Sequence, residues 1–575
     1  MDKLFNYVKN NKTEVLCVGF ITLIAVILRA IVLKNFGEIW YDEMFSWFFA
    51  SQKTFLESAY QTMVRDIHMP LYFTVLHFWI KLFGDSLESM RLCSIILTLP
   101  LVPLGFYLAK YLFKSSTAGY FSAIFLALNT FCIYYCVEIR HYSLTMVLAL
   151  LTAFFFVKYI QQFDKRNKIG YIISLSLLLY TFSIAPLVAV GYLLTGLIYL
   201  YFKKKEMLVE FIKTHLIIIL CCLPVVYFTI YNTIMLNQAF TYYPRDNFPH
   251  DNRIFIDIIE NFFSFRNYQI VINNSVVYSL RTEMFSNPAY TICVFVPVLI
   301  AISMFVKAFF SKKEELYLFI LPTVLFFLMI NTLSMTHKAV IQARYFTIIF
   351  PIIIAVMCYG FSSFKKKYIS VILFSLFIYL NTMWLYFDEK TVFNLNRGEL
   401  GNLNSLFTYT FKSKEDDLIV VPLSGQMLKH GIRKGTIIPF AADSAFVLKD
   451  KKSQEFYLGK QKAKELNRST IRRYLLDSYM QDKPLPEYEK NLYETYIKDM
   501  KKGQRFILFS FFADGIASAK EREINLDTYK DYNLPEYIIS KVTRDSFLIF
   551  DKYLKHKTTY ISQSFGYSVV IFEKE

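Results

Sequence analysis

Val15–Leu33 reads VLCVGFITLIAVILRAIVL, and Trp40–Glu43, WYDE, follows it after a short connection. An apolar stretch of this length is long enough to cross about 30 Å of hydrocarbon as a helix. It therefore predicts a membrane span, with Asp42 and Glu43 placing two adjacent carboxylates just beyond its end. Carboxylates at such a boundary are costly if buried and ordinary if solvated, so their surroundings decide what they do.

The composition of the whole chain agrees with that span. Of 575 residues, 55% are hydrophobic, 18% aromatic and only 19% charged, which is too apolar for a soluble enzyme. The apolar runs have the length of helices, so a helical bundle is favoured over a β-barrel. The formal charge of +17 lies largely in Lys/Arg clusters between these runs. The positive-inside rule explains clusters of this kind, and we expect no nucleic-acid partner.

The chain divides near residue 388. We expect residues 1–388 to form a multi-span catalytic domain and residues 389–575 a soluble α/β domain. The sequence predicts about eleven spans, at about 15–34, 89–112, 118–137, 141–160, 169–182, 184–202, 211–232, 289–309, 315–334, 343–360 and 367–387.

Loop charges predict the orientation of these spans. Lys9 and Lys12 put the N-terminus in the cytoplasm, and the later lysine clusters fit the same side only if Pro70–Phe83 does not cross. We therefore expect that segment to lie in the outer interface. With this topology, Asp42, Glu43 and the domain that follows residue 388 face outward.

The loops expected on the outer side contain the polar residues that could take part in catalysis or bind a substrate. They are Asp42, Glu43 and His68, with Arg91 at the next span; Glu138, Arg140 and Tyr142; residues of a large loop at about 235–286; and Arg344 and Tyr345.

Each of these clusters alone has a plainer explanation. Asp42 and Glu43 would cap a helix start, since acids favour N-termini. Glu138 and Arg140 would form a structural ion pair, although residues two apart do not face one another on a helix. Arg344-Tyr345 would anchor a span at the interface, and His68 would belong to a turn. Their convergence on one leaflet favours a functional site instead.

A set of this kind suits transfer of a group from an anionic lipid donor. A carboxylate near an acceptor hydroxyl or amine can remove its proton, and arginines bind a leaving phosphate. Interfacial aromatic rings suit sugars and isoprenoid chains. The membrane supplies such a donor, and the sequence contains neither a GxxxxGK[ST] loop nor a glycine-rich dinucleotide fingerprint.

Five motifs occur in a recognisable order. After WYDE come HMPLY at 68–72, FGDSLESMRLCS at 83–94, EIRHYSL at 138–144 and ARYFTIIFP at 343–351. This order resembles the GT-C membrane glycosyltransferases, and within them the bacterial group of protein O-mannosyltransferases and aminoarabinose transferases. The resemblance covers residues 15–160 well and 335–355 more loosely. It implies a GT-C-like fold, a polyprenyl-phosphate sugar donor and inverting direct displacement at the extracytoplasmic face.

The resemblance also implies roles for residues. Asp42 would be the general base that activates the acceptor, and Glu43 would assist it or orient the donor. Arg140 would contact the acidic pair or the lipid phosphate, with Glu138 as its local partner. The remaining donor-binding candidates are His68, Arg91, Tyr142, Arg344 and Tyr345, of which Arg344 would be a second phosphate ligand.

In one place the chain departs from its relatives. The turn YTFS at 180–183 replaces a His-containing turn, so we expect no histidine contact from it. Relatives divide on metal dependence, and we expect no obligatory metal or other cofactor, with a divalent metal left open. The eight cysteines indicate neither a disulfide framework nor a zinc site.

The final residues predict a soluble α/β domain without catalytic motifs. Strands are expected at Asp417–Leu423, Thr436–Phe440, Arg505–Phe512 and Ser546–Phe550, with a closing hairpin from Thr558 to Phe572 and helices at about 453–467, 469–481 and 486–502. This domain would cover the active site or bind the acceptor.

The function expected from the sequence is thus sugar transfer in the bacterial plasma membrane. The Lys-, Ile- and Asn-rich composition indicates a bacterial source, and hence undecaprenyl phosphate as the lipid. The acceptor is a glycan, a lipid or a protein. The alternatives are a lipid-linked glycan polymerase or ligase, a polytopic lipid or sugar transporter, for which no internal repeat is found, and a non-catalytic export subunit.

Overall fold

The structure is a computed structural model of the chain. It describes residues 11–36, 41–65, 68–235, 258, 262–263, 288–311, 314–337, 343–387, 414–421, 434–439, 451–466, 474, 486–510, 545–562 and 567–575. The expected domain boundary near residue 388 and most of the loop at 235–286 lie outside these residues.

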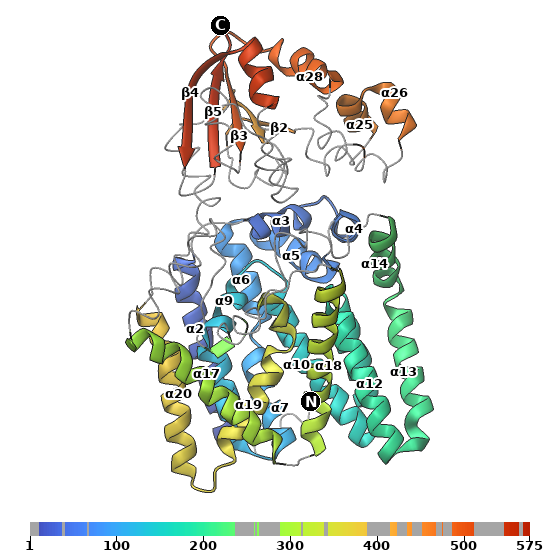
Figure 1. Cartoon of the computed structure of the whole chain (residues 1–575), viewed down its shortest axis with the longest axis vertical. Helices are drawn as coiled ribbons and strands as arrows, with labels where there is room; N and C mark the ends of the chain where they lie inside the picture. The colour runs from blue at the N-terminus through green and yellow to red at the C-terminus, as the bar shows by residue number, and fades with distance from the viewer. Residues whose placement is uncertain are drawn as a thin grey trace.

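A large helical part is followed by a small sheet part (Figure 1). The helices are α2 (Lys12–Asn35), α3 (Tyr41–Ala50), α4 (Phe55–Arg65), α5 (Pro70–Phe83), α6 (Leu87–Leu97), α7 (Leu101–Phe113), α8 (Ser116–Leu128), α9 (Thr130–Val137), α10 (Tyr142–Gln162), α11 (Lys165–Leu179), α12 (Ala185–Lys203), α13 (Leu208–Cys221), α14 (Leu223–Met235), α17 (Pro288–Phe309), α18 (Glu314–His337), the 3₁₀ helix η3 (Ala343–Ile348), α19 (Phe350–Ser362) and α20 (Lys367–Phe387). The predicted class, a polytopic helical protein with a C-terminal sheet domain, is confirmed.

The number of spans is not confirmed as eleven. Within the described residues, five helical segments are long and apolar enough to cross a membrane, or up to seven if two bent pairs each count as one span. The five are Lys12–Lys34, Leu87–Phe113, Tyr142–Gln162, Ala185–Lys203 and Leu316–Leu333. The expected span at 343–360 instead begins as η3, and its α-helix has only 13 residues.

The expected span at 118–137 is one of the bent pairs. Its two helices, α8 and α9, meet at Asn129 with a bend of 57°. The Asn129 side chain causes the break locally, because its Oδ1 accepts a hydrogen bond from the backbone N–H of Cys132 at 2.9 Å and so starts a new helix. The bend ends α9 at Val137, directly before the EIRHYSL motif.

Helices α3, α4 and α5 lie at the end of the helical part that faces the sheet (Figure 1). Helix α5 has 14 residues, or about 21 Å at 1.5 Å per residue, which is short for a span. It begins at Pro70, whose missing N–H suits a first helical position. The backbone N–H of Leu71 donates to the carbonyl of Tyr180 at 2.9 Å, which ties the start of α5 to the YTFS turn.

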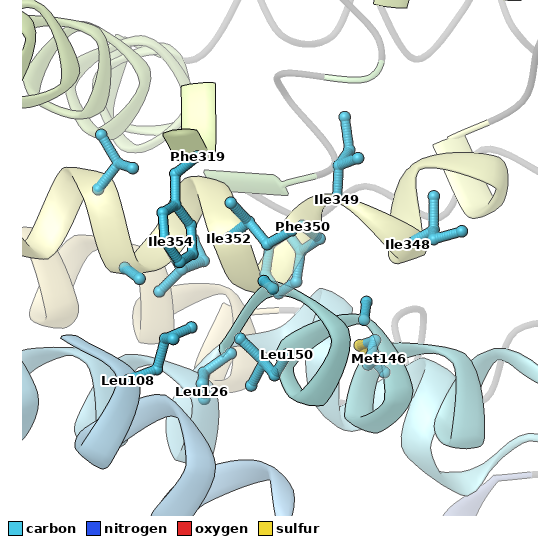
Figure 2. Packing of buried hydrophobic residues seen from close by; sticks show 14 of the residues in the cluster. Leu108, Leu126, Met146, Leu150, Phe319, Ile348, Ile349, Phe350, Ile352 and Ile354 are labelled. Atoms are coloured by element: carbon cyan, nitrogen blue, oxygen red, sulfur yellow. The ribbon is translucent and has the colours of Figure 1, made fainter. Parts of the chain in front are cut away.

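The core of the helical part holds η3 in place. Figure 2 shows Ile348 of η3 and Phe350 of α19 on the side of Met146 and Leu150 of α10, in the same apolar cluster. Helices α12 and α18 also pack closely, since a Cβ at Gly191 of α12 would lie 2.9 Å from the carbonyl oxygen of Pro322 in α18. These contacts fix η3, and with it Arg344, relative to α10.

The C-terminal part contains a five-stranded mixed sheet. Its strands are β1 (Leu418–Val421), β2 (Thr436–Pro439), β3 (Arg505–Ser510), β4 (Lys555–Ser562) and β5 (Tyr567–Glu573), in the order β2-β1-β3-β5-β4. Strands β2, β1 and β3 are parallel, and β5 runs antiparallel to β3 and β4. Helices α25 (Lys451–Leu458), α26 (Lys460–Glu465) and α28 (Pro486–Leu492) pack on one face.

One predicted strand of this domain is wrong. Residues 545–553, which include the expected strand Ser546–Phe550, are helical. Phe547, Phe550 and Leu554 are buried, while Leu548 is half exposed. Buried positions three and four residues apart line one face of a helix, so this apolar run has the period of a helix and not the alternation of a strand. The other three strands and the hairpin are confirmed within the described residues.

Candidate functional site

The first element of the site is an ion pair between the WYDE motif and the ARYFTIIFP motif. Asp42 lies in the first turn of α3, and Arg344 lies in η3. Arg344 Nη1 donates to Asp42 Oδ2 at 2.7 Å, and the two side chains remain 16% and 20% exposed, respectively. Both side chains of this ion pair therefore remain partly accessible to a ligand.

Arg140 adds a second cation next to Asp42. Its Nη1 donates to the backbone oxygen of Asp42 at 3.2 Å and to Ser46 Oγ at 3.4 Å. Its Nη2 donates to His68 Nε2 at 2.5 Å, which places the ring proton of a neutral His68 on Nδ1. Two arginines and a histidine thus surround one turn of α3. This is a positive environment suited to a phosphate.

Glu43, the next residue of α3 after Asp42, is fully buried. Arg91 donates to both Glu43 oxygens, from Nη2 at 2.8 Å and from Nε at 3.3 Å, and the Arg91 side chain is 2% exposed. Glu43 Oε1 also accepts the backbone N–H of Ile139 at 3.0 Å. The guanidinium carbon of Arg91 lies 4.8 Å from the centre of the Phe36 ring. This pair therefore joins α3, α6 and the turn before α10.

Glu138 lies at the centre of these charges and is fully buried. Burial, followed by the nearby negative charges of Glu43 and Asp42, raises the pKa of Glu138 to about 8. Its backbone oxygen accepts a hydrogen bond from Ser94 Oγ at 2.8 Å. The Glu138 carboxyl is thus largely protonated at neutral pH, so it is a neutral hydrogen-bonding group beside the ionised Asp42.

Aromatic rings form a wall beside the charged groups. His141 lies with its ring centre 4.6 Å from that of Phe182 and 5.3 Å from that of His68. Phe182 in turn lies 6.5 Å from Tyr345, and Tyr142 lies 4.4 Å from His141. This aromatic wall, made of His141, Tyr142, Phe182 and Tyr345, offers flat faces of the kind that bind sugars.

All nine candidate residues from the sequence are described, and the contacts connect them into one region. The structure adds Ser46, Ser94, His141 and Phe182, to which the motifs assign no role. Ser94 lies in the FGDSLESMRLCS motif and His141 in the EIRHYSL motif, so their closeness in sequence to the charged residues is the available signal. Phe182 had none, because it enters through the turn where the chain departs from its relatives.

Within the described part of the chain, no three His, Cys, Asp or Glu side chains gather in a way that could hold a metal ion. Arginines dominate the charged contacts of the site. Guanidinium groups donate five N–H bonds and accept none, so this arrangement is suited to an anion.

Comparisons with known proteins give a match to one family over part of the chain and a similar fold over nearly all of it. Residues 67–230 match the family described as dolichyl-phosphate-mannose-protein mannosyltransferase. Among solved structures, ArnT from Cupriavidus metallidurans in the apo state is similar over 96% of this chain and 98% of that chain, with a TM-score of 0.52 and 11% sequence identity. The same protein bound to undecaprenyl phosphate gives a TM-score of 0.51, 11% identity and coverage of 96% and 97%. No curated protein sequence matches the chain.

These comparisons confirm the resemblance found in the sequence. The chain has the ArnT fold over almost its whole length, and with its long apolar helices it is an integral membrane protein. The family match contains His68, Arg91, Glu138, Arg140 and Tyr142. Asp42, Glu43, Arg344 and Tyr345 lie outside it and are connected to it by the fold.

Proposed function

We propose that this chain, a GT-C-type glycosyltransferase with the ArnT fold, moves a sugar from undecaprenyl phosphate to an extracytoplasmic acceptor by inverting direct displacement. The observation that carries the proposal is the Asp42–Arg344 ion pair, because it unites a base for the acceptor and a ligand for the leaving phosphate. The binding of undecaprenyl phosphate by ArnT of the same fold supports this lipid as the carrier.

The ion pair also provides a way to couple donor binding to activation. While Arg344 donates to Asp42 Oδ2 at 2.7 Å, that oxygen is occupied by the guanidinium. A donor phosphate competes with Asp42 for Arg344, since a guanidinium binds phosphate as readily as carboxylate. Donor binding would then release Asp42 toward the acceptor, which makes the base available only when the donor is present.

The chemical step needs no covalent intermediate. The acceptor oxygen or nitrogen attacks the anomeric carbon as its proton passes to the Asp42 carboxylate. The bond from that carbon to the phosphate oxygen breaks, and its electron pair leaves with the phosphate. Arg344 and Arg140 stabilise the charge that develops there. Attack from the face opposite the phosphate inverts the anomeric configuration.

The resemblance implied that Glu43 assists Asp42 or orients the donor, but its contacts favour a structural role. Both of its oxygens are engaged by Arg91, and one also by the N–H of Ile139, in a fully buried position. This geometry favours Glu43 and Arg91 as positioning residues that hold α3 against α6, and with it the backbone of Asp42. Glu138, kept neutral by its raised pKa, would donate a hydrogen bond to the donor without repelling the phosphate.

We further propose that the site and the C-terminal domain face the outside of a bacterial plasma membrane, with the domain boundary near residue 388. The connections that carry Lys203–Lys205 and Lys365–Lys367 lie at the end of the helical part opposite the sheet (Figure 1). The positive-inside rule places that end in the cytoplasm. The sheet domain then stands on the side where an acceptor glycan, lipid or protein would arrive.

The test uses the full-length chain in nanodiscs with a panel of undecaprenyl-phosphate sugars and an envelope fraction as acceptor. Release of free undecaprenyl phosphate is measured for the wild type, Asp42→Asn, Arg344→Ala and the control Glu465→Gln, a carboxylate-to-amide change at an exposed residue of α26. We expect the first two variants to lose about 10²- to 10⁴-fold in rate and the control to lose nothing. Full activity of Asp42→Asn would remove it as the base.

The same assay separates the rival functions. A polymerase or ligase releases the same lipid but lengthens or joins a glycan, which analysis of the product detects. A transporter moves the intact donor across a liposome membrane and releases no free undecaprenyl phosphate. Asp42→Asn would leave the function of a non-catalytic export subunit intact.

A further inference from the structure

His141 is the buried polar group that the proposed reaction does not yet use. It directly precedes α10, and its side chain has no exposed surface. Neither ring nitrogen has a hydrogen-bond partner among the described residues. Its neighbour Arg140 donates to Asp42, Ser46 and His68 in the same region. An unpartnered imidazole is thus held within reach of the site.

The surroundings of His141 keep its ring uncharged. Burial above all, together with the positive charges of Arg140 and Arg344, lowers the pKa of His141 well below its ordinary value. A neutral imidazole has one N–H donor and one acceptor nitrogen. Two unused hydrogen-bonding positions without charge match a hydroxyl group, which both donates and accepts. They do not match a phosphate, which Arg140 and Arg344 are placed to bind.

The rings around His141 are apolar faces. Tyr142 lies 4.4 Å from it and Phe182 4.6 Å from it, measured between ring centres. Phe182 makes ring contacts here rather than hydrogen bonds, so a shift of its side chain breaks no polar interaction. Sugars combine hydroxyl groups with flat C–H faces, and aromatic rings beside a hydrogen-bonding group recognise that combination.

We propose that His141 is a specificity-determining residue whose ring nitrogens hydrogen-bond a hydroxyl group of the donor sugar, which packs against Phe182 and Tyr142. This inference rests on the proposed function and adds a contact to the sugar itself. Donor binding opens the closed contact between Phe182 and His141. The lipid phosphate remains with Arg140 and Arg344, so sugar and phosphate are recognised by separate groups.

The test compares wild type with His141→Phe, which keeps a ring of similar size without nitrogens, and with His141→Gln, which restores a donor and an acceptor. The control His215→Phe changes a buried histidine of α13, which packs on α11 and α12. The probes are the undecaprenyl-phosphate hexose that the wild type uses, mannose being tried first, its monodeoxy forms, and undecaprenyl phosphate alone. Thermal unfolding of each variant checks folding.

We expect His141→Phe to lower kcat/KM for the complete sugar by roughly tenfold to a hundredfold, because the substrate hydroxyl loses its partner. One monodeoxy donor should be used equally by wild type and His141→Phe, which identifies the hydroxyl. His141→Gln should recover part of the loss, and the affinity for undecaprenyl phosphate alone should not change. Equal losses for all donors, or no loss for any, would overturn the proposal.

A failure of the proposed function gives a result that differs from a failure of the proposal about His141. If the wild type turns over no sugar donor, binding replaces turnover as the measurement. The proposal about His141 then requires that His141→Phe bind the complete lipid-linked sugar more weakly than the wild type while binding undecaprenyl phosphate equally. Equal binding of the sugar donor by both proteins would reject it.

Discussion

Asp42 and Arg344 are 302 positions apart in the chain, and their side chains meet at 2.7 Å. The contact joins the motif after the first span to the motif before α19. A partly exposed ion pair of this kind contributes at most about 1 kcal/mol, so a ligand of higher charge can replace one partner. This makes the pair suited to exchange rather than to stability.

If a lipid phosphate replaces Asp42 at Arg344, then substitutions of Asp42 and of Arg344 should have opposite effects on the affinity for that lipid. Asp42→Asn should bind undecaprenyl phosphate about two- to fivefold more tightly, because the carboxylate no longer competes for Arg344. Arg344→Ala should bind it at least about tenfold more weakly, because a charged hydrogen bond is lost. Binding of the lipid in nanodiscs measures both, with Glu465→Gln as control. Weaker binding by Asp42→Asn would argue against competition between carboxylate and phosphate.

Glu138 predicts an alkaline limit to donor binding. Its pKa of about 8 means that it is neutral below that pH and negative above it. The added charge repels the donor phosphate, so KM for the donor should rise above pH 8 in the wild type. Glu138→Gln stays neutral, and its KM should remain level between pH 7 and 9. An identical rise in both proteins would assign the limit to another group.

The raised pKa of Glu138 also predicts how the free energy of unfolding depends on pH. The unfolded chain releases this proton near the ordinary pKa of a glutamate, whereas the folded chain retains it up to about pH 8. The free energy of unfolding should therefore fall as the pH rises toward 8. Thermal unfolding at several pH values measures this decrease, which should be smaller in Glu138→Gln. A wild type whose stability rises with pH over this range would contradict the prediction.

The buried pair of Glu43 and Arg91 predicts a large effect of single changes. Removing one partner leaves the other charge buried without compensation, which costs about 3–5 kcal/mol. Arg91→Met should therefore lower the unfolding temperature strongly, and adding Glu43→Gln should recover part of the loss. The exposed pair Lys552–Glu489 is the control, where Lys552→Met should cost less than about 1 kcal/mol. A double variant worse than Arg91→Met alone would contradict this explanation.

The proposed orientation predicts which introduced cysteines a membrane-impermeant maleimide can reach. Lys462→Cys lies in α26 of the C-terminal part and should react in intact spheroplasts. Lys366→Cys lies between α19 and α20 and should react only after the membrane is opened. The unmodified chain, whose Cys17 and Cys221 are exposed, supplies the background. The reverse pattern would invert the assigned sides.

Local patterns in the sequence were sufficient for the class of protein and for most elements of the C-terminal sheet. Strands β1, β2 and β3 were predicted because short β-branched and aromatic runs were bounded by charged or turn-forming residues. The expected strand at Ser546–Phe550 failed for a related reason. In a short apolar run, periods of 2 and 3.6 cannot be separated, and the buried Leu554 that completes the helical face lies beyond it.

In the helical part, too, the local sequence pattern does not predict every element. Apolar length identified the segment at 118–137, but only the side chain of Asn129, bonding to the N–H of Cys132, divides it into two helices bent by 57°. Apolar length cannot report such a break, because the residues on both sides remain equally hydrophobic.

The sequence by itself determined that this protein is a helical membrane protein with an acidic pair, arginines and a histidine in an ordered set of motifs. Only the tertiary structure decided which of these residues pair with one another and which of the pairs are buried. It pairs Asp42 with Arg344 in a partly open place and Glu43 with Arg91 in a closed one, although the two carboxylates are adjacent in the chain. Successive residues of a helix point about 100° apart, so neighbours in sequence face different environments, and the packing of distant segments sets the charge and burial of each.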